Sequence, residues 1–188
     1  MRAPLNFPPG YLVSVPGGDS GIASTIAEMK KLMHGPTGVR SLLVRHFTLQ
    51  AVRGVERGMR EIDAVFHAVK DNIEFREEYQ ETLQSPEFTI REGAGDCDDQ
   101  AMLAATMLES LGFETRFKTV GDSENLSHVY VEVRDKSTGR WVSLDTTVAE
   151  SYPGWEPDGM ARSEVYGANS SNDGVLLIAA AAVAALFL

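Results

Sequence analysis

Residues 95–101 read Gly-Asp-Cys-Asp-Asp-Gln-Ala, and this stretch decides the fold because it places Cys97 at the predicted start of a helix. Alanine and leucine recur at helical spacing up to residue 111, and Gly112 stands where a helix-ending glycine is expected. The unpaired N–H groups at a helix start favour a thiolate, whereas the neighbouring Asp98 and Asp99 oppose it. Because small buried cysteines are also common in packing roles, the helix position alone leaves a catalytic and a structural cysteine open.

Two predicted strands, at residues 128–134 and 141–145, follow this helix and are joined by a short turn. Valine alternates with polar or aromatic residues along the first strand, so one face of the pair is expected to enter the core. In the register set by the turn, Tyr130 lies opposite Asp145, and His128 is a diagonal neighbour of Asp145. These three side chains share the face that points away from the valines. A carboxylate orients a neighbouring imidazole, and a charged imidazole stabilises a thiolate. A slip of one residue in register would turn Asp145 away from His128.

Four sequence blocks carry a resemblance to a known family. They are Gly95-Asp96-Cys97-Asp98-Asp99, Leu111-Gly112-Phe113-Glu114-Thr115-Arg116, Ser127-His128-Val129-Tyr130-Val131-Glu132-Val133 and Trp141-Val142-Ser143-Leu144-Asp145-Thr146-Thr147. In this order, and on these predicted elements, the blocks resemble the transglutaminase-like superfamily, whose domains share a papain-like core. The resemblance covers roughly residues 61–147, and the short chain is most similar to the small stand-alone members found in bacteria, phages and prophages.

The resemblance implies an α+β fold in which a helical N-terminal half precedes a nucleophile helix packed on a small antiparallel sheet. It implies that Cys97 is the nucleophile, His128 the general base and acid, and Asp145 the residue that orients the imidazole. The backbone N–H of Cys97 is one expected oxyanion donor; Gln84 is a candidate for the second, and Tyr130 matches the aromatic residue that often follows the histidine. The implied activity is a cysteine hydrolase or acyltransferase that acts on an amide bond of a protein or peptide through an acyl-cysteine, without a cofactor.

Composition excludes several other classes of function. The formal net charge of −10 opposes binding to the phosphates of nucleic acid. A single cysteine rules out an intrachain disulfide, and the absence of CxxC and HxxxH spacing argues against zinc. A twelve-residue calcium loop starting at Asp96 would need glycine at position 101 and glutamate at 107, where the chain has Ala101 and Met107. We therefore expect no metal site.

Outside the motif blocks, the sequence predicts further helices at residues 19–34, 39–54 and 60–79, the first capped by Asp19 and Ser20. Residues 82–96 contain Pro86 and two glycines and are interpreted as a loop. A strand is expected at residues 113–120, and the chain after Thr147 is expected to be irregular. The domain is therefore placed at residues 19–166, with a polar linker at 167–174.

The two ends of the chain differ from the domain in composition. Residues 1–18 hold four prolines and predict an extended arm, either a disordered tail or a segment laid along a partner subunit. Their lack of an apolar run argues against a secretory signal and for production in the cytoplasm. The last 14 residues, from Val175 to Leu188 (175–188), are all apolar and predict a C-terminal helix.

As a helix, residues 175–188 would reach about 21 Å, which is short against a hydrocarbon core of about 30 Å. Such an apolar segment is expected to dock into a larger protein assembly or to act as a short membrane anchor. The alternative function is therefore a non-catalytic structural component of a phage-type virion, docked through the N-terminal arm and the apolar segment. The chain would then be associated with that assembly or with a membrane.

Overall fold

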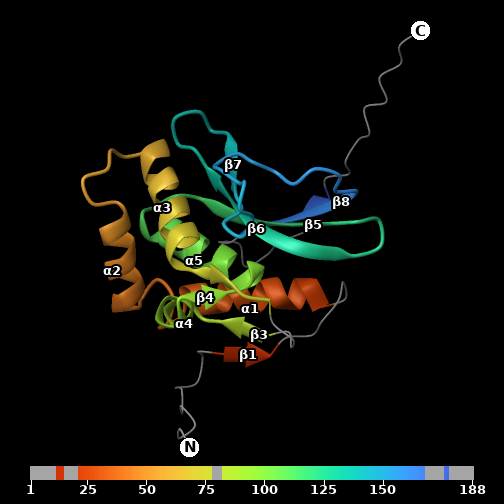
Figure 1. Ribbon diagram of the computed structural model, residues 1–188, viewed down its shortest axis with the longest axis horizontal. Helices are drawn as coiled ribbons and strands as arrows, with labels where there is room; N and C mark the ends of the chain where they lie inside the picture. The colour runs from red at the N-terminus through yellow and green to blue at the C-terminus, as the bar shows by residue number, and fades with distance from the viewer. Residues whose placement is uncertain (1–11, 15–20, 78–81, 168–175, 178–188) are drawn as a thin grey trace, which may run out of the picture.

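Helices occupy most of the first half of the chain and antiparallel strands most of the second, as the sequence predicts (Figure 1). The computed structural model describes residues 12–14, 21–77, 82–167 and 176–177. In chain order, the elements are β1 Leu12–Ser14, α1 Ile22–His34, α2 Leu42–Ala51, α3 Met59–Asn72, β2 Glu74–Phe75, β3 Thr82–Gln84, α4 Pro86–Glu92, β4 Ala94–Gly95, α5 Cys97–Ser110, β5 Thr115–Gly121, β6 Leu126–Arg134, β7 Trp141–Leu144, β8 Arg162–Gly167 and β9 Leu176–Leu177.

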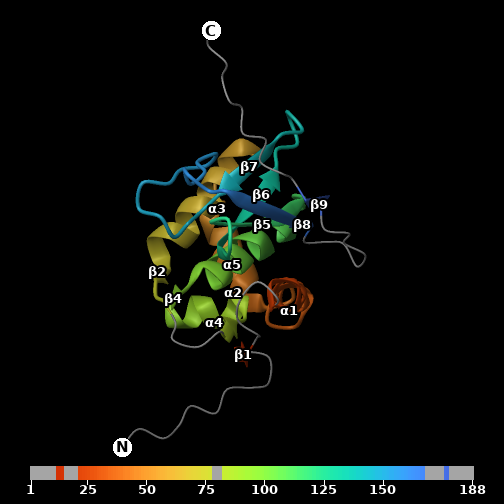
Figure 2. The ribbon, with the colours of Figure 1, turned by 90° about the vertical axis from the view of Figure 1, so that its right-hand side faces the viewer.

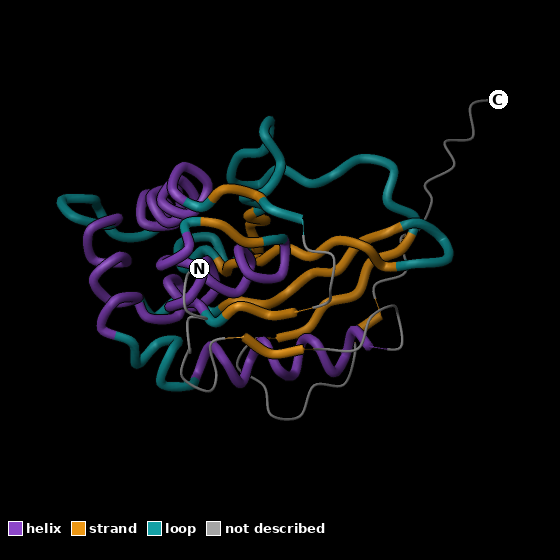
Figure 3. The backbone as a smooth tube through the Cα atoms, turned by 60° about the horizontal axis from the view of Figure 1, so that its bottom comes forward, coloured by secondary structure: helices purple, strands orange, loops and turns teal. Residues whose placement is uncertain are grey.

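Helix α5 is the centre of the domain. It contacts each of the other four described helices as well as β5 and β6, and every residue from Asp99 to Leu108 is buried. Small alanines on this helix allow the neighbouring elements to approach closely. The helices gather on one side of the main sheet (Figure 2), and α1 runs along the strands on that side (Figure 3). This arrangement confirms the prediction that the helix starting at Cys97 packs on an antiparallel sheet.

The start of α5 is held by two aspartates that cap it reciprocally. The Asp99 N–H donates to Oδ1 of Asp96 at 3.2 Å, and the Asp96 N–H donates to Oδ2 of Asp99 at 3.4 Å. Oδ1 of Asp99 also accepts the backbone N–H of Gln84 at 2.7 Å, which ties β3 to the helix start. Asp99 is fully buried, so this acid does more than the favourable dipole contact expected from the sequence.

The main sheet has the strand order β7-β6-β5-β8-β9, and all of its pairs are antiparallel. Strands β6 and β7 pair with Val131 opposite Leu144 and Glu132 opposite Ser143. Continuing this register by one residue puts Tyr130 opposite Asp145, as the turn predicted. The valines of β6 are buried against α5, so the opposite face carries His128 and Tyr130.

Four segments differ from the sequence-based expectations. Residues 82–96 are not a loop but form β3, α4 and β4, and Pro86 stands in the first turn of α4, where its missing N–H costs nothing. Strand β8 lies in the region expected to be irregular, because its partner β5 is distant in sequence. Helix α3 ends at Asn72 rather than near residue 79, and α1 is capped by Gly21. The proposed caps Asp19 and Ser20 lie outside the described residues.

The chain ends are described only in part. Leu12–Ser14 form β1 and pair with β3 of the same chain, so this part of the arm lies on its own domain. Leu176–Leu177 form β9 beside β8, which corrects the expectation of a C-terminal helix at these two positions. The rest of both segments lies outside the described residues. Within the part of the chain that is described, no helix has the length and apolar character needed to cross a membrane.

Candidate active site

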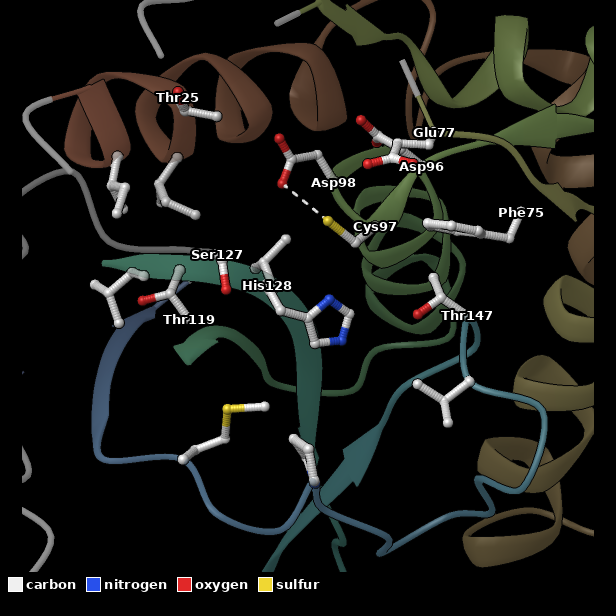
Figure 4. Close-up of a pocket in the computed structure, with 17 residues that line it drawn as sticks. Thr25, Phe75, Glu77, Asp96, Cys97, Asp98, Thr119, Ser127, His128 and Thr147 are labelled. Atoms are coloured by element: carbon white, nitrogen blue, oxygen red, sulfur yellow. Dashed lines mark hydrogen bonds between the residues drawn. The ribbon is translucent and has the colours of Figure 1, made fainter. Parts of the chain in front are cut away.

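A pocket of about 590 Å³ opens at the start of α5, and both Cys97 and His128 line it (Figure 4). Its walls come from α1, β2, α5, β5, β6 and the segment after β7. The lining residues are Ile22, Thr25, Ile26, Phe75, Glu77, Asp96, Cys97, Asp98, Thr119, Leu126, Ser127, His128, Val129, Thr147, Val148, Pro157 and Met160. The predicted nucleophile and the predicted base therefore share one pocket, although they come from different elements.

Cys97 is half-buried in the first turn of α5, and its Sγ lies 4.0 Å from Oδ1 of Asp98. Burial raises the pKa of the Cys97 thiol well above its ordinary value, and the charges of Asp98 and Asp96 raise it further. Backbone hydrogen bonds from Val129 and Asp98 lower the pKa in part without reversing this. The thiol is thus protonated at neutral pH, because burial and the aspartate charges outweigh the effect of the helix start.

His128 and Asp145 form a short hydrogen bond, with Nε2 of the imidazole 2.6 Å from Oδ2 of the carboxylate. The Asp145 side chain is only 1% exposed. Burial pushes its pKa up, but the hydrogen bond and charge of His128, together with hydrogen bonds from Thr147, leave the pKa below the ordinary value. Asp145 is therefore ionised and accepts a hydrogen bond from the Nε2 N–H, so the second ring nitrogen, Nδ1, is the one that can act as a base.

Cys97 and His128 lie next to each other in the pocket, with the imidazole on the opposite side of the cysteine from Asp96, Asp98 and Glu77 (Figure 4). In the described part of the chain, no hydrogen bond joins the sulfur to the imidazole, and Nδ1 has no hydrogen-bond partner. The structure thus links His128 to Asp145 directly, and the predicted contact between the thiol and His128 stays a prediction.

The two further candidates from the sequence lie outside the pocket lining. Gln84 is buried in β3, where its backbone N–H binds Asp99. Tyr130 follows His128 on the same face of β6, and the two ring centroids are 6.0 Å apart. Burial raises the pKa of Tyr130 to about 12 despite the opposing charge of Lys118. Neither side chain is therefore carried into the site that we propose below.

Much of the pocket wall could not be found by inspecting the sequence. Three residues that line the pocket belong to no motif block: Thr25 of α1, Glu77 after β2 and Met160 after β7. Thr147 also lines the pocket and is the last residue of the last block. Their positions depend on how distant elements pack, and no local periodicity marks them. The wall contains carboxylates and no lysine or arginine, and no cluster of metal-ligating side chains occurs in the described ranges.

Three solved structures that are similar to this chain have low sequence identity to it. A "putative protease" from Parabacteroides distasonis matches 83% of this chain and 30% of its own length, with 12% identity and a TM-score of 0.52. A "putative cysteine protease" from Cytophaga hutchinsonii matches 55% of this chain and 37% of its own, with 22% identity and a TM-score of 0.44. A structure named a TGase matches 83% and 37%, with 10% identity and a TM-score of 0.46. This chain thus spans roughly a third of the length of these proteins.

No curated protein matches this chain in sequence. A family model described as the transglutaminase-like superfamily matches residues 45–146, more than half of the 188 residues. The matched region begins within α2, contains the whole of α5 and ends just after Asp145, so it includes Cys97, His128 and Asp145. On this match, with the fold and the pocket as described, the chain belongs to the transglutaminase-like superfamily.

Proposed function

We propose that this protein is a cysteine hydrolase or acyltransferase that opens an amide bond through an acyl-cysteine at Cys97. The observation that carries the proposal is the 2.6 Å hydrogen bond between His128 and the buried Asp145, at a pocket that also contains Cys97. A buried carboxylate that fixes one ring nitrogen leaves the other available as a base beside a nucleophile. Membership of the transglutaminase-like superfamily supports the proposal, in which Cys97, His128 and Asp145 are the nucleophile, the base and the orienting carboxylate.

In the proposed reaction, Nδ1 of His128 takes the thiol proton as the sulfur attacks the carbonyl carbon of the amide. The oxygen gains the negative charge of the tetrahedral intermediate, and the Cys97 backbone N–H stabilises it. The imidazolium then gives its proton to the leaving nitrogen, the C–N bond breaks, and a thioester remains on Cys97. Water or an amine then attacks this thioester and gives a proton to His128. The C–S bond breaks, His128 returns the proton to the sulfur, and the carboxylic acid or the new amide leaves, which gives hydrolysis or transfer, respectively.

The raised pKa of Cys97 determines when the proton moves. Since the thiol is protonated in the resting pocket, His128 has to remove the proton during attack rather than hold a preformed ion pair. The carboxylates on one side of the thiol also disfavour substrates with negative charge beside the scissile bond.

Acetylation by p-nitrophenyl acetate tests the proposed function without a known natural substrate. We expect rapid acetylation of Cys97, seen by mass spectrometry of its tryptic peptide, and diversion of the acetyl group to an added primary amine if the protein is a transferase. The control variant combines Cys97→Ala with Ser123→Cys, which moves the only thiol to an exposed loop position. Equal acetylation rates of the two thiols would show that Cys97 has no catalytic activation.

Substitution of Asp98 by asparagine should make Cys97 react faster with iodoacetamide at neutral pH. Burial would still raise the thiol pKa, but the added effect of the Asp98 charge would be lost. Since the thiolate is the reactive form, the pH profile of alkylation should move toward lower pH. Asp71→Asn, at an exposed carboxylate of α3, is the control. An unchanged profile in Asp98→Asn would mean that Asp98 does not affect the thiol.

The alternative role in a phage-type assembly rests on residues 175–188, of which the structure describes only the two residues of β9. It therefore stays a prediction. Sedimentation of the full chain and of a chain lacking residues 175–188 would separate an assembling protein from a monomer.

A further inference from the structure

Lys70 on α3 holds the chain that carries Asp145. Its Nζ donates to the backbone oxygen of Val148 at 2.6 Å, to that of Ser151 at 3.0 Å, and to Oγ of Ser151 at 2.8 Å. It also lies 5.2 Å from the centroid of the Phe66 ring. All three hydrogen-bond acceptors are neutral oxygens, and Lys70 forms no ion pair with any carboxylate in the described ranges. An ammonium group with three donors fits such a convergence of oxygens.

Ser151 continues this contact to Asp145. Its Oγ lies 2.5 Å from the backbone oxygen of Asp145 and 2.7 Å from that of Val148, so its one proton is shared between these two acceptors. The same Oγ accepts a hydrogen bond from Lys70. Ser151 is 7% exposed, so these groups have little access to water as a substitute partner. Thr147 holds Oδ1 of the Asp145 carboxylate through its N–H at 3.1 Å and its hydroxyl at 2.7 Å. Every oxygen of Asp145 therefore has a protein partner.

The same turn forms part of the pocket wall, since Thr147 and Val148 both line the pocket. Lys70 itself does not line it. The ammonium group thus connects the helical half of the domain to the one segment that supplies both the carboxylate partner of His128 and a wall of the pocket. Three hydrogen bonds from a single side chain therefore tie α3 to that segment.

We infer that Lys70 is a positioning residue for the candidate active site, which aligns the Asp145 carboxylate with His128 through Ser151 and the backbone of residues 145–151. The catalytic part of this inference rests on the proposed function. The alignment itself is a property of the resting protein and can be measured without any turnover.

Lys70→Met tests the inference, because it keeps an unbranched apolar stem beside Phe66 and removes all three donors. In the unsubstituted protein, we expect the Nε2 proton of His128 to appear as a strongly deshielded, slowly exchanging imidazole N–H signal, owing to its short bond to Asp145. In Lys70→Met this signal should be lost or broadened by exchange, whereas Lys70→Arg should retain it. The rate of Cys97 acetylation in Lys70→Met should fall by about a hundredfold, as expected for a misplaced catalytic group.

Ser151→Ala provides a second variant that removes only one hydroxyl, and it should weaken the same signal even if Lys70→Met does not fold. Lys31→Met is the control, since Lys31 is 74% exposed and pairs with Glu28 in its own helix. A normal His128 signal in folded Lys70→Met, together with a lower unfolding temperature, would overturn the inference and leave Lys70 a purely structural residue. A lost signal in a protein whose Cys97 is never acetylated would instead support the positioning role and refute the proposed function.

Discussion

Substitution of His128 by alanine is expected to slow the acetylation of Cys97 by roughly two to four orders of magnitude, the usual contribution of a positioned general base. The reason is specific to this pocket. Burial and two carboxylates keep the Cys97 thiol protonated, so attack requires a base that takes the proton as the bond to carbon forms. His128 is the imidazole that lines the pocket, and its Nε2 is already held by Asp145.

The measurement is the rate constant for acetyl transfer from p-nitrophenyl acetate to Cys97, followed by stopped-flow absorbance and confirmed by mass spectrometry. Two control variants separate loss of the base from a general disturbance. His67→Ala removes a histidine that is 55% exposed on α3 and interacts with Asp63 and Asp71. Ser127→Ala changes the pocket wall beside His128 without removing a base. A His128→Ala rate within a few-fold of these controls would contradict the proposed mechanism.

Substitution of Asp99 by alanine is expected to lower the free energy of unfolding by roughly 2–4 kcal/mol, since it leaves buried N–H groups without acceptors. Asp99 is fully buried, and its carboxylate accepts the N–H of Gln84 at 2.7 Å and that of Asp96 at 3.4 Å. Water cannot replace these contacts at a buried helix start. The same change should loosen the first turn of α5, which carries Cys97.

Urea unfolding followed by circular dichroism measures this loss. Glu61→Ala is the matched control, because Glu61 occupies the equivalent position in the first turn of α3 and accepts the Gly58 N–H at 3.0 Å, but it is only part-buried. We expect Glu61→Ala to cost about 1 kcal/mol or less. Equal losses in the two variants would mean that Asp99 acts only as an ordinary helix cap.

The positions of Cys97, His128 and Asp145 on their elements could be predicted from the sequence, because they depend on local patterns. Alternating valines and a short turn determine which residues of β6 and β7 share a face, so the placement of His128 near Asp145 follows from counting. The start and end of α5 follow from its apolar stripe and from Gly112, whose φ of 80° suits glycine. For α4, the signal was present but misread, since proline favours the first turn of a helix as well as a loop.

Tertiary structure alone decided the rest. Strand β8 depends on its pairing with β5, which lies more than forty residues away, and its own sequence alternates weakly. The pocket wall joins α1, β2 and the segment after β7, and no spacing within the chain relates these parts. The protonated state of Cys97 depends on burial, which is a property of the packed domain. The contact from Lys70 to the turn after Asp145 likewise exists only once α3 has packed beside that turn. Local periodicity determines which face a side chain occupies, whereas its solvation and its distant partners are set by packing between elements far apart in the chain.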